Sequence, residues 1–110
     1  MTFYDDDIEA KNKESKREFQ RRRDREIADL RSVLKSSEGR RFVWKMLSEC
    51  GVFRASFSLN AMQTAFAEGR RDIGIMLVKE LDEADPGAYA QMQREHYSEL
   101  KSRKHEKEEE

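Results

Sequence analysis

A long stretch without any helix-breaking residue most constrains how this chain can fold. No glycine or proline interrupts residues 8–34, and the stretch is dominated by Glu, Lys, Arg, Gln and Ala, which favour helices. The whole sequence contains one proline, Pro86, and five glycines. Further along, apolar residues recur at the three- and four-residue spacing of one helix face. The sequence therefore predicts an all-α protein, a small bundle of about four helices.

Apolar residues are scarce in the first half of the long helix and return at helical spacing only between Phe19 and Leu34. We therefore expect a charged N-terminal helical arm at residues 1–26 and a helical core domain at residues 27–100. The charged tail, residues 101–110, has no apolar residue. A segment that cannot bury apolar surface does not repay its ordering entropy, so we expect this tail to be disordered.

A second helix should follow the first after a short connection. Ser36 or Ser37 is suited to be its N-cap, since a hydroxyl oxygen accepts hydrogen bonds from the first free backbone N–H groups. Gly51 is suited to end it in the left-handed conformation, with Val52 contacting Leu47 as in a Schellman close.

Two more helices are predicted in the second half of the chain. Ser58 is expected to cap a third helix that continues to about Leu81. Asp85 followed by Pro86 is a favourable start for a fourth helix, because proline is preferred at the first helical position. Leu100 should lie near the end of the fourth helix.

Apolar residues that share helix faces define the expected core. Trp44 lies off the main stripe of the second helix, so the pattern leaves open whether it enters the core, faces another helix or meets a partner protein. The core is expected to contain Leu30, Leu34, Phe42, Val43, Met46, Leu47, Phe53, Phe57, Phe66, Ile73, Leu77 and Tyr89.

The sequence Glu-Gly-Arg-Arg occurs twice, at residues 38–41 and 68–71, with Met-Leu following at the same offset each time. Gly39 and Gly69 both fall in the middle of an apolar helix face. Because a glycine inside a helix costs about 1 kcal/mol relative to alanine, two at matching positions suggest a close approach of backbones. We interpret them as a crossing of the second and third helices, although chance similarity and a binding site around the arginines remain alternatives.

The arginines of the two motifs, Arg40 with Arg41 and Arg70 with Arg71, would lie beside this crossing. We expect Arg40 and Arg70 to reach nearby glutamates or helix-end carbonyls. Glu80 falls on the apolar face of the third helix, where a carboxylate needs a partner, and an arginine is the natural one.

A basic stretch lies in the N-terminal helix, since residues 11–25 carry eight bases and three acids, a net charge of +5. Clustered cations on a helix neutralise phosphates and can bind nucleic acid or a partner. Interleaved acids and the acidic residues 5–7 upstream favour the alternative of a solvated helix face. The candidate contact residues are Lys16, Arg17, Arg21, Arg22, Arg23 and Arg25.

No pattern typical of catalysis, metal binding or cofactor binding occurs in the sequence. His96 and His105 do not form a ligand motif, and Cys50 lies on an apolar stripe where a cysteine is usually a small core residue. We expect a protein that is not an enzyme and needs no cofactor or metal. A single cysteine excludes an internal disulfide, and no apolar run is long enough to span a bilayer, so we expect a soluble protein that folds inside the cell.

Residues 34–57 and 66–95 resemble a family of small proteins from tailed bacteriophages, first catalogued in a Bordetella podovirus. The similarity lies in both Glu-Gly-Arg-Arg segments, in Cys50-Gly51-Val52-Phe53 at the end of the second helix, and in the turn from Pro86 to Tyr89. The family's members are short helical proteins typically encoded close to head and portal genes.

The resemblance implies a role in the virion or in its morphogenesis, exerted through contacts with portal or internal proteins. We expect the protein in the virion or the host cytoplasm. Two alternatives are a nucleic-acid-binding protein that uses the basic helix and a phage inhibitor directed at a host enzyme. A long charged helix with one sparse apolar stripe is often completed by a second copy, so the oligomeric state stays open.

Overall fold

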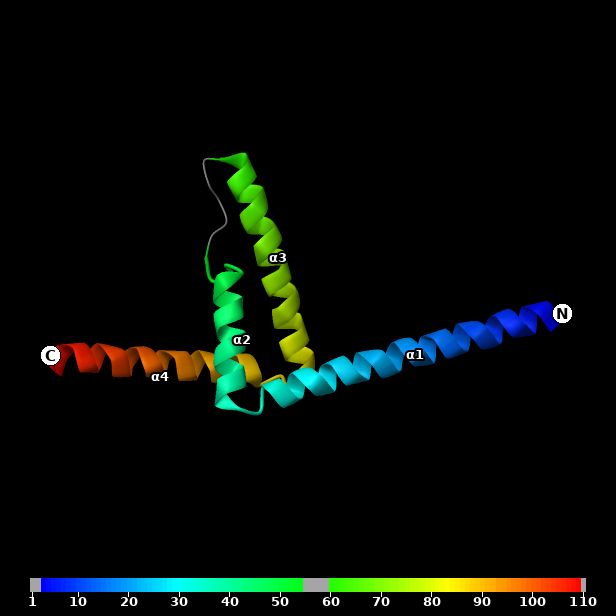
Figure 1. The fold of residues 1–110 in the computed structure, drawn as a ribbon, viewed down its shortest axis with the longest axis horizontal. Helices are drawn as coiled ribbons and strands as arrows, with labels where there is room; N and C mark the ends of the chain where they lie inside the picture. The colour runs from blue at the N-terminus through cyan, green and yellow to red at the C-terminus, as the bar shows by residue number, and fades with distance from the viewer. Residues whose placement is uncertain (1–2, 55–59, 110) are drawn as a thin grey trace.

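The computed structural model describes residues 3–54 and 60–109, with side chains from residue 7 onward. The described residues form four helices and no strand, which confirms the all-α prediction (Figure 1). The helices are α1 (Phe3–Val33), α2 (Ser37–Glu49), α3 (Ala61–Ala84) and α4 (Ala88–Glu109).

The two charged ends of the chain are both helical. The N-terminal arm and the beginning of the expected core domain share one helix, α1, because no residue between them interrupts helical geometry. The expectation of a disordered tail is wrong, since α4 continues to Glu109. Arg103 pairs with Glu99, and His105 contacts Glu109, four residues apart on the helix surface. Such pairs each stabilise a helix by only about 0.2–0.5 kcal/mol.

The end signals of α2 are where the sequence predicts them. The hydroxyl of Ser36 accepts a hydrogen bond of 3.0 Å from the Gly39 backbone N–H. Gly51 has a φ of 75°, and the Val52 N–H bonds the Leu47 carbonyl at 3.4 Å, completing the predicted Schellman close. Local chemistry alone therefore fixes both ends of this helix.

The N-cap of α3 is Asn60, whose side-chain oxygen accepts hydrogen bonds of 2.9 Å from Met62 N and 3.2 Å from Gln63 N. The expected cap, Ser58, lies outside the described residues. In the turn between α3 and α4, the Asp85 carboxylate accepts a 3.1 Å hydrogen bond from Gly87 N. Asp85 itself caps the end of α3, and α4 begins at Ala88, two residues after the predicted first position at Pro86.

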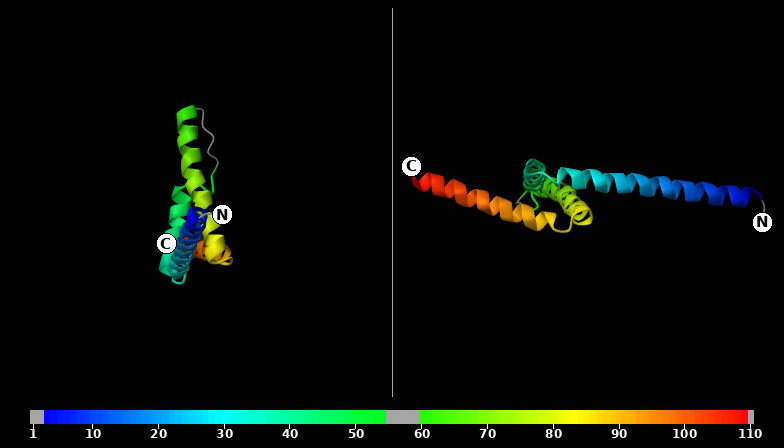
Figure 2. Two further views of the ribbon diagram at one scale, coloured as in Figure 1. Left: turned by 90° about the vertical axis from the view of Figure 1, so that its right-hand side faces the viewer. Right: turned by 90° about the horizontal axis from the view of Figure 1, so that it is seen from below.

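The four helices form a thin layer rather than a rounded bundle. In Figure 1, α2 and α3 run side by side, and α1 and α4 leave their lower end in opposite directions. Figure 2 shows the same arrangement from two other sides. The molecule measures 80 × 39 × 16 Å and has a radius of gyration of 20.9 Å, whereas a compact chain of this length has about 13 Å. Much of each long helix therefore lies beyond the core.

The core is small and sits where the end of α1, the middle of α2, the end of α3 and the start of α4 meet. Three of the expected core residues, Leu34, Val43 and Leu47, are buried, while Leu30, Leu77 and Tyr89 pack at its edge. Met92, which was expected to face inward from the fourth helix, is buried. Leu81, Ala84 and Ala88 are buried as well, although the sequence pattern did not place them in the core.

Part of the expected core is on the surface. A thin layer has little interior, so apolar side chains on the outer sides of α2 and α3 find no neighbouring helix. Phe57 lies outside the described residues. The expected core residues that are exposed are Phe42, Met46, Phe53, Phe66 and Ile73.

Candidate interaction surfaces

Arg40, from the first Glu-Gly-Arg-Arg segment, ties three helices together. Its Nη1 donates to the Leu34 carbonyl at the end of α1 at 2.8 Å, and its Nε donates to the Glu95 carboxylate of α4 at 2.9 Å. Only 13% of its side chain is exposed. Arg40 therefore serves the structure at the place where α1 turns into α2.

Arg70, from the second segment, makes the equivalent contact at the end of α2. Its Nη2 donates to the Glu49 carbonyl at 2.7 Å, and its guanidinium lies 5.6 Å from the centre of the Phe66 ring. The expectation that Arg40 and Arg70 reach helix-end carbonyls is confirmed.

The second arginine of each segment behaves differently. The side chain of Arg41 is more than half exposed, and its Nη2 lies 3.9 Å from Oε1 of Glu38. Arg71 is half-buried, and its Nε is enclosed without a hydrogen-bond partner in the part of the chain that the structure describes.

The predicted helix crossing at Gly39 and Gly69 is wrong. A Cβ at Gly39 would lie 1.8 Å from the Val33 carbonyl oxygen, so this glycine makes room for the end of α1. A Cβ at Gly69 would meet nothing within 4 Å. The close approach between α2 and α3 occurs instead at Gly74, where a Cβ would lie 2.3 Å from Val52 Cγ2 and 2.8 Å from Cys50 Cβ.

Arg23, one of the six basic candidates, is held on α3. It forms ion pairs with Glu80 and Glu83 of α3 and with Glu26 of its own helix. The carboxylate of Glu80, followed by that of Glu83, raises the pKa of Arg23 further above its already high ordinary value. This confirms that Glu80 has an arginine partner and removes Arg23 from the set of free cations.

The other five basic candidates lie on the exposed surface of α1. Arg17, Arg21 and Arg25 follow each other at four-residue spacing, on the side of the helix turned away from Arg23. The Nε of Arg21 bonds the Arg17 carbonyl at 3.4 Å. Lys16 and Arg22 lie outside this row, so the structure brings only part of the predicted basic site together.

An apolar stripe on α3 is exposed, although the sequence pattern predicts that part of it lies in the core. Met62, Phe66, Gly69, Ile73 and Met76 are spaced four, three, four and three residues apart, the heptad spacing of a helix seam. We call these five residues the α3 stripe. Its four large side chains are 82, 68, 59 and 58% exposed. The heptad spacing was visible in the sequence, but spacing does not tell whether a seam is covered.

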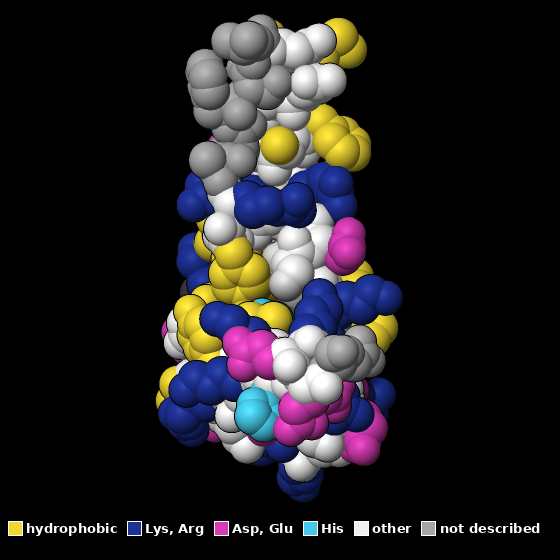
Figure 3. Space-filling view, turned by 90° about the vertical axis from the view of Figure 1, so that its left-hand side faces the viewer, with side chains coloured by type: hydrophobic (Ala, Val, Ile, Leu, Met, Phe, Trp, Pro, Cys, Tyr) yellow, Lys and Arg dark blue, Asp and Glu magenta, His cyan; other side chains and the backbone are white. Residues whose placement is uncertain are grey.

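Figure 3 shows the molecule from the end at which α4 terminates. Basic and acidic side chains are mixed over the lower part of this face, and hydrophobic side chains lie across its middle. More hydrophobic side chains project at the upper right, where the first turns of α3 lie.

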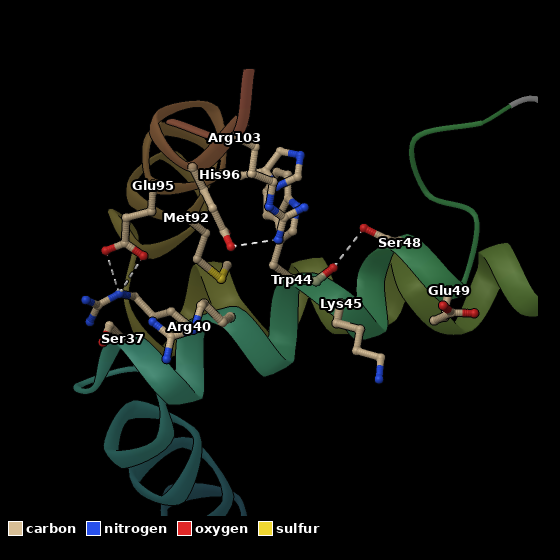
Figure 4. A pocket seen from close by; sticks show the side chains of 12 residues that line it. Ser37, Arg40, Trp44, Lys45, Ser48, Glu49, Met92, Glu95, His96 and Arg103 are labelled. Atoms are coloured by element: carbon tan, nitrogen blue, oxygen red, sulfur yellow. Dashed lines mark hydrogen bonds and ion pairs between the residues drawn. The ribbon is translucent and has the colours of Figure 1, made fainter. Parts of the chain in front are cut away.

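A groove of about 760 Å³ separates α2 from α4 (Figure 4). Trp44 fills its end, with its ring centre 4.8 Å from that of Phe53 and 5.1 Å from that of His96. Trp44 thus faces a neighbouring helix, one of the alternatives that the sequence left open. The rim carries charges of both signs, so the groove shows no preference for an anion or a cation.

Among residues 7–54 and 60–109 no group of three or more His, Cys, Asp or Glu side chains is arranged to hold a metal ion. None of the helices in that part of the chain is long and apolar enough to cross a membrane. Cys50 is a free thiol, half-buried against α3.

Comparison with known proteins gives one family. The model of the Bbp19-like phage protein family matches residues 30–94, which include both Glu-Gly-Arg-Arg segments and the small core. Searches among curated proteins and among solved structures found no match.

Proposed function

The chain belongs to the Bbp19-like phage protein family, and from this we propose that it is a virion-associated or morphogenesis accessory protein that acts through protein contacts. Its partners would be other virion proteins, at the portal or inside the particle. It would work in the virion or, during assembly, in the host cytoplasm.

The observation that carries this proposal is the exposed α3 stripe. Contiguous apolar patches above a few hundred Å² are uncommon on proteins that act alone, and they usually mark contact surfaces. The two long helices of the molecule extend far from the core, so different parts of the chain can contact different neighbouring proteins. A protein built in this way is suited to bridge neighbours.

An enzymatic role has no comparable support. Two of the least exposed arginines, Arg23 and Arg40, are engaged in ion pairs that hold helices together. We therefore propose a protein that is not an enzyme.

Quantitative mass spectrometry of purified mature phage particles and of unpackaged precursor heads tests the proposal. We expect the chain in at least one of them, at a fixed small multiple of the portal copy number. Presence only in precursor heads would indicate an assembly factor that leaves the particle. Absence from both would refute the proposal.

A second candidate function is nucleic-acid binding by α1, favoured by the exposed row of Arg17, Arg21 and Arg25. Binding through phosphates should weaken steeply as salt rises. Replacing the three arginines by Gln should abolish it without unfolding the protein, because their side chains are exposed. A matched control removes three exposed cations from α4, through Arg94→Gln, Lys101→Gln and Lys104→Gln. Affinity that is unchanged between low and physiological salt would exclude this function.

A further inference from the structure

We propose that the α3 stripe binds a second copy of this chain, with the two α3 helices packed antiparallel about a two-fold axis close to Gly69. The proposal rests on the proposed function and deepens it: the stripe serves contact between copies of the chain, and contacts with other virion proteins would then be made by the long helices α1 and α4. It rests on the spacing, the size, the symmetry and the partial covering of the stripe.

The face of α3 that carries the stripe continues to the place where α1 packs on α3. Beyond Met76 the same four- and three-residue steps lead to Glu80 and Glu83, and both are paired with Arg23 of α1. One helix, α1, thus covers the last part of the seam. The part from Met62 to Met76, about 21 Å long, has the geometry to receive another helix and lacks one among the described residues.

The exposed surface of the stripe amounts to more than half of what a standard stable interface buries on each partner. A fully exposed large side chain offers roughly 200 Å², so the four exposed fractions of the stripe correspond to about 500 Å² per copy. A standard stable interface buries roughly 800 Å² on each partner. Flanking residues such as Ala65 and Arg70, which lie at the edges of the stripe, would supply much of the remainder.

The stripe is nearly symmetrical about its centre. Met62 and Met76 lie seven residues before and after Gly69, and Phe66 and Ile73 lie three before and four after. A two-fold axis across the helix therefore places large side chains of one copy opposite large side chains of the other, as a self-complementary interface requires. Gly69, which has open space around it, would face the partner's Gly69 near the axis, where the absence of side chains lets the two backbones approach closely.

The position of α1 selects the antiparallel orientation. In a parallel pair, the second α3 would have to pass Glu80 and Glu83, where α1 already lies. In an antiparallel pair, each α3 needs only the free part of the seam, and the two α1 helices lie at opposite ends. The edges of the stripe carry Asp72 on one side and Arg70 on the other, with no block of like charge to oppose pairing.

Sedimentation of the purified full-length chain over a range of concentrations tests the proposal. We expect a reversible monomer–dimer equilibrium. Phe66→Glu should weaken dimerisation on the order of a hundredfold, because it places a charge in the contact and removes a large apolar side chain from it in each copy. Phe42→Glu on α2 is the matched control, since Phe42 is 62% exposed and Phe66 is 68% exposed. The control should dimerise like the parent.

Cross-linking tests the orientation. In chains carrying Cys50→Ser, an equal mixture of Met62→Cys and Met76→Cys chains should give mixed dimers with a short bismaleimide, and each chain alone should give few. A monomer at all concentrations, equal weakening by both Phe→Glu variants, or efficient linking of each chain only with itself would each overturn the proposal. A monomeric chain found in phage particles would leave the proposed function standing, so the two failures are distinguishable.

Discussion

At the scale of single residues, arginines hold this protein's helix ends together. The last carbonyls of a helix have no partner within the helix, and a guanidinium satisfies them while also meeting the negative end of the helix dipole. Arg40 does this for α1 and Arg70 for α2. Arg31 does it for α3, where its Nε donates to the Ala84 carbonyl at 2.9 Å. The repeated Glu-Gly-Arg-Arg segment thus repeats a contact.

The two arginines of the first segment should differ sharply in their effect on stability. Arg40→Met removes hydrogen bonds to the Leu34 carbonyl and to Glu95, so we expect the free energy of unfolding to fall by about 2 kcal/mol. Arg41→Met should change it by less than about 0.5 kcal/mol, because Arg41 is exposed and makes only a long contact with Glu38. Urea unfolding of both variants measures the difference, and equal values would show that the Arg40 contacts contribute little.

At the scale of helices, the sequence predicts both ends of α2 well and the packing partners of the helices poorly. Ser36, Gly51 and Asp85 act through bonds to residues a few positions away, so local chemistry is sufficient to find them. Hydrophobic spacing shows which face of a helix is apolar, but the neighbour that covers this face can come from anywhere in the chain. That is why Phe42 and Ile73, correctly placed on apolar faces, were wrongly placed in the core.

Gly69 and Gly74 of α3 also show that the sequence does not reveal packing partners. Replacing each by alanine should change the free energy of unfolding in opposite directions. Each glycine destabilises the helix relative to alanine, and only the fold shows at which of the two positions a side chain would clash with a neighbour. Gly74→Ala should lower the free energy of unfolding, because its Cβ would overlap Val52 and Cys50. Gly69→Ala should raise it by up to about 1 kcal/mol, since its Cβ would meet nothing. Thermal melts at low protein concentration check both signs, and a stabilising Gly74→Ala would contradict the close approach of α2 and α3.

At the scale of the whole molecule, a small core supports two helices that extend far beyond it. Among the described residues, all the buried side chains lie within residues 34–92, and the family match covers residues 30–94. The first ion pairs of α1 with α3 are made by Arg23, a few residues before the proposed boundary of the arm at residue 26. The first half of α1 makes no comparable contact with another helix among the described residues. It therefore lengthens the molecule and adds little to the free energy of unfolding.

Shortening α1 from its N-terminus should therefore have a threshold. Removal of residues 1–18 should leave cooperative melting at nearly the same temperature, because the ion pairs of Arg23 with α3 and the packing of Ile27 and Leu30 on the core involve later residues. Removal of residues 1–26 should lower the melting temperature, because the ion pairs of Arg23 with Glu80 and Glu83 are lost. Arg23→Met in the full chain is the control and should reproduce most of this second decrease. Circular dichroism at low protein concentration follows all three. Loss of cooperative melting in the shorter deletion would mean that the first half of α1 supports the core, and the division into an arm and a core domain would then be wrong.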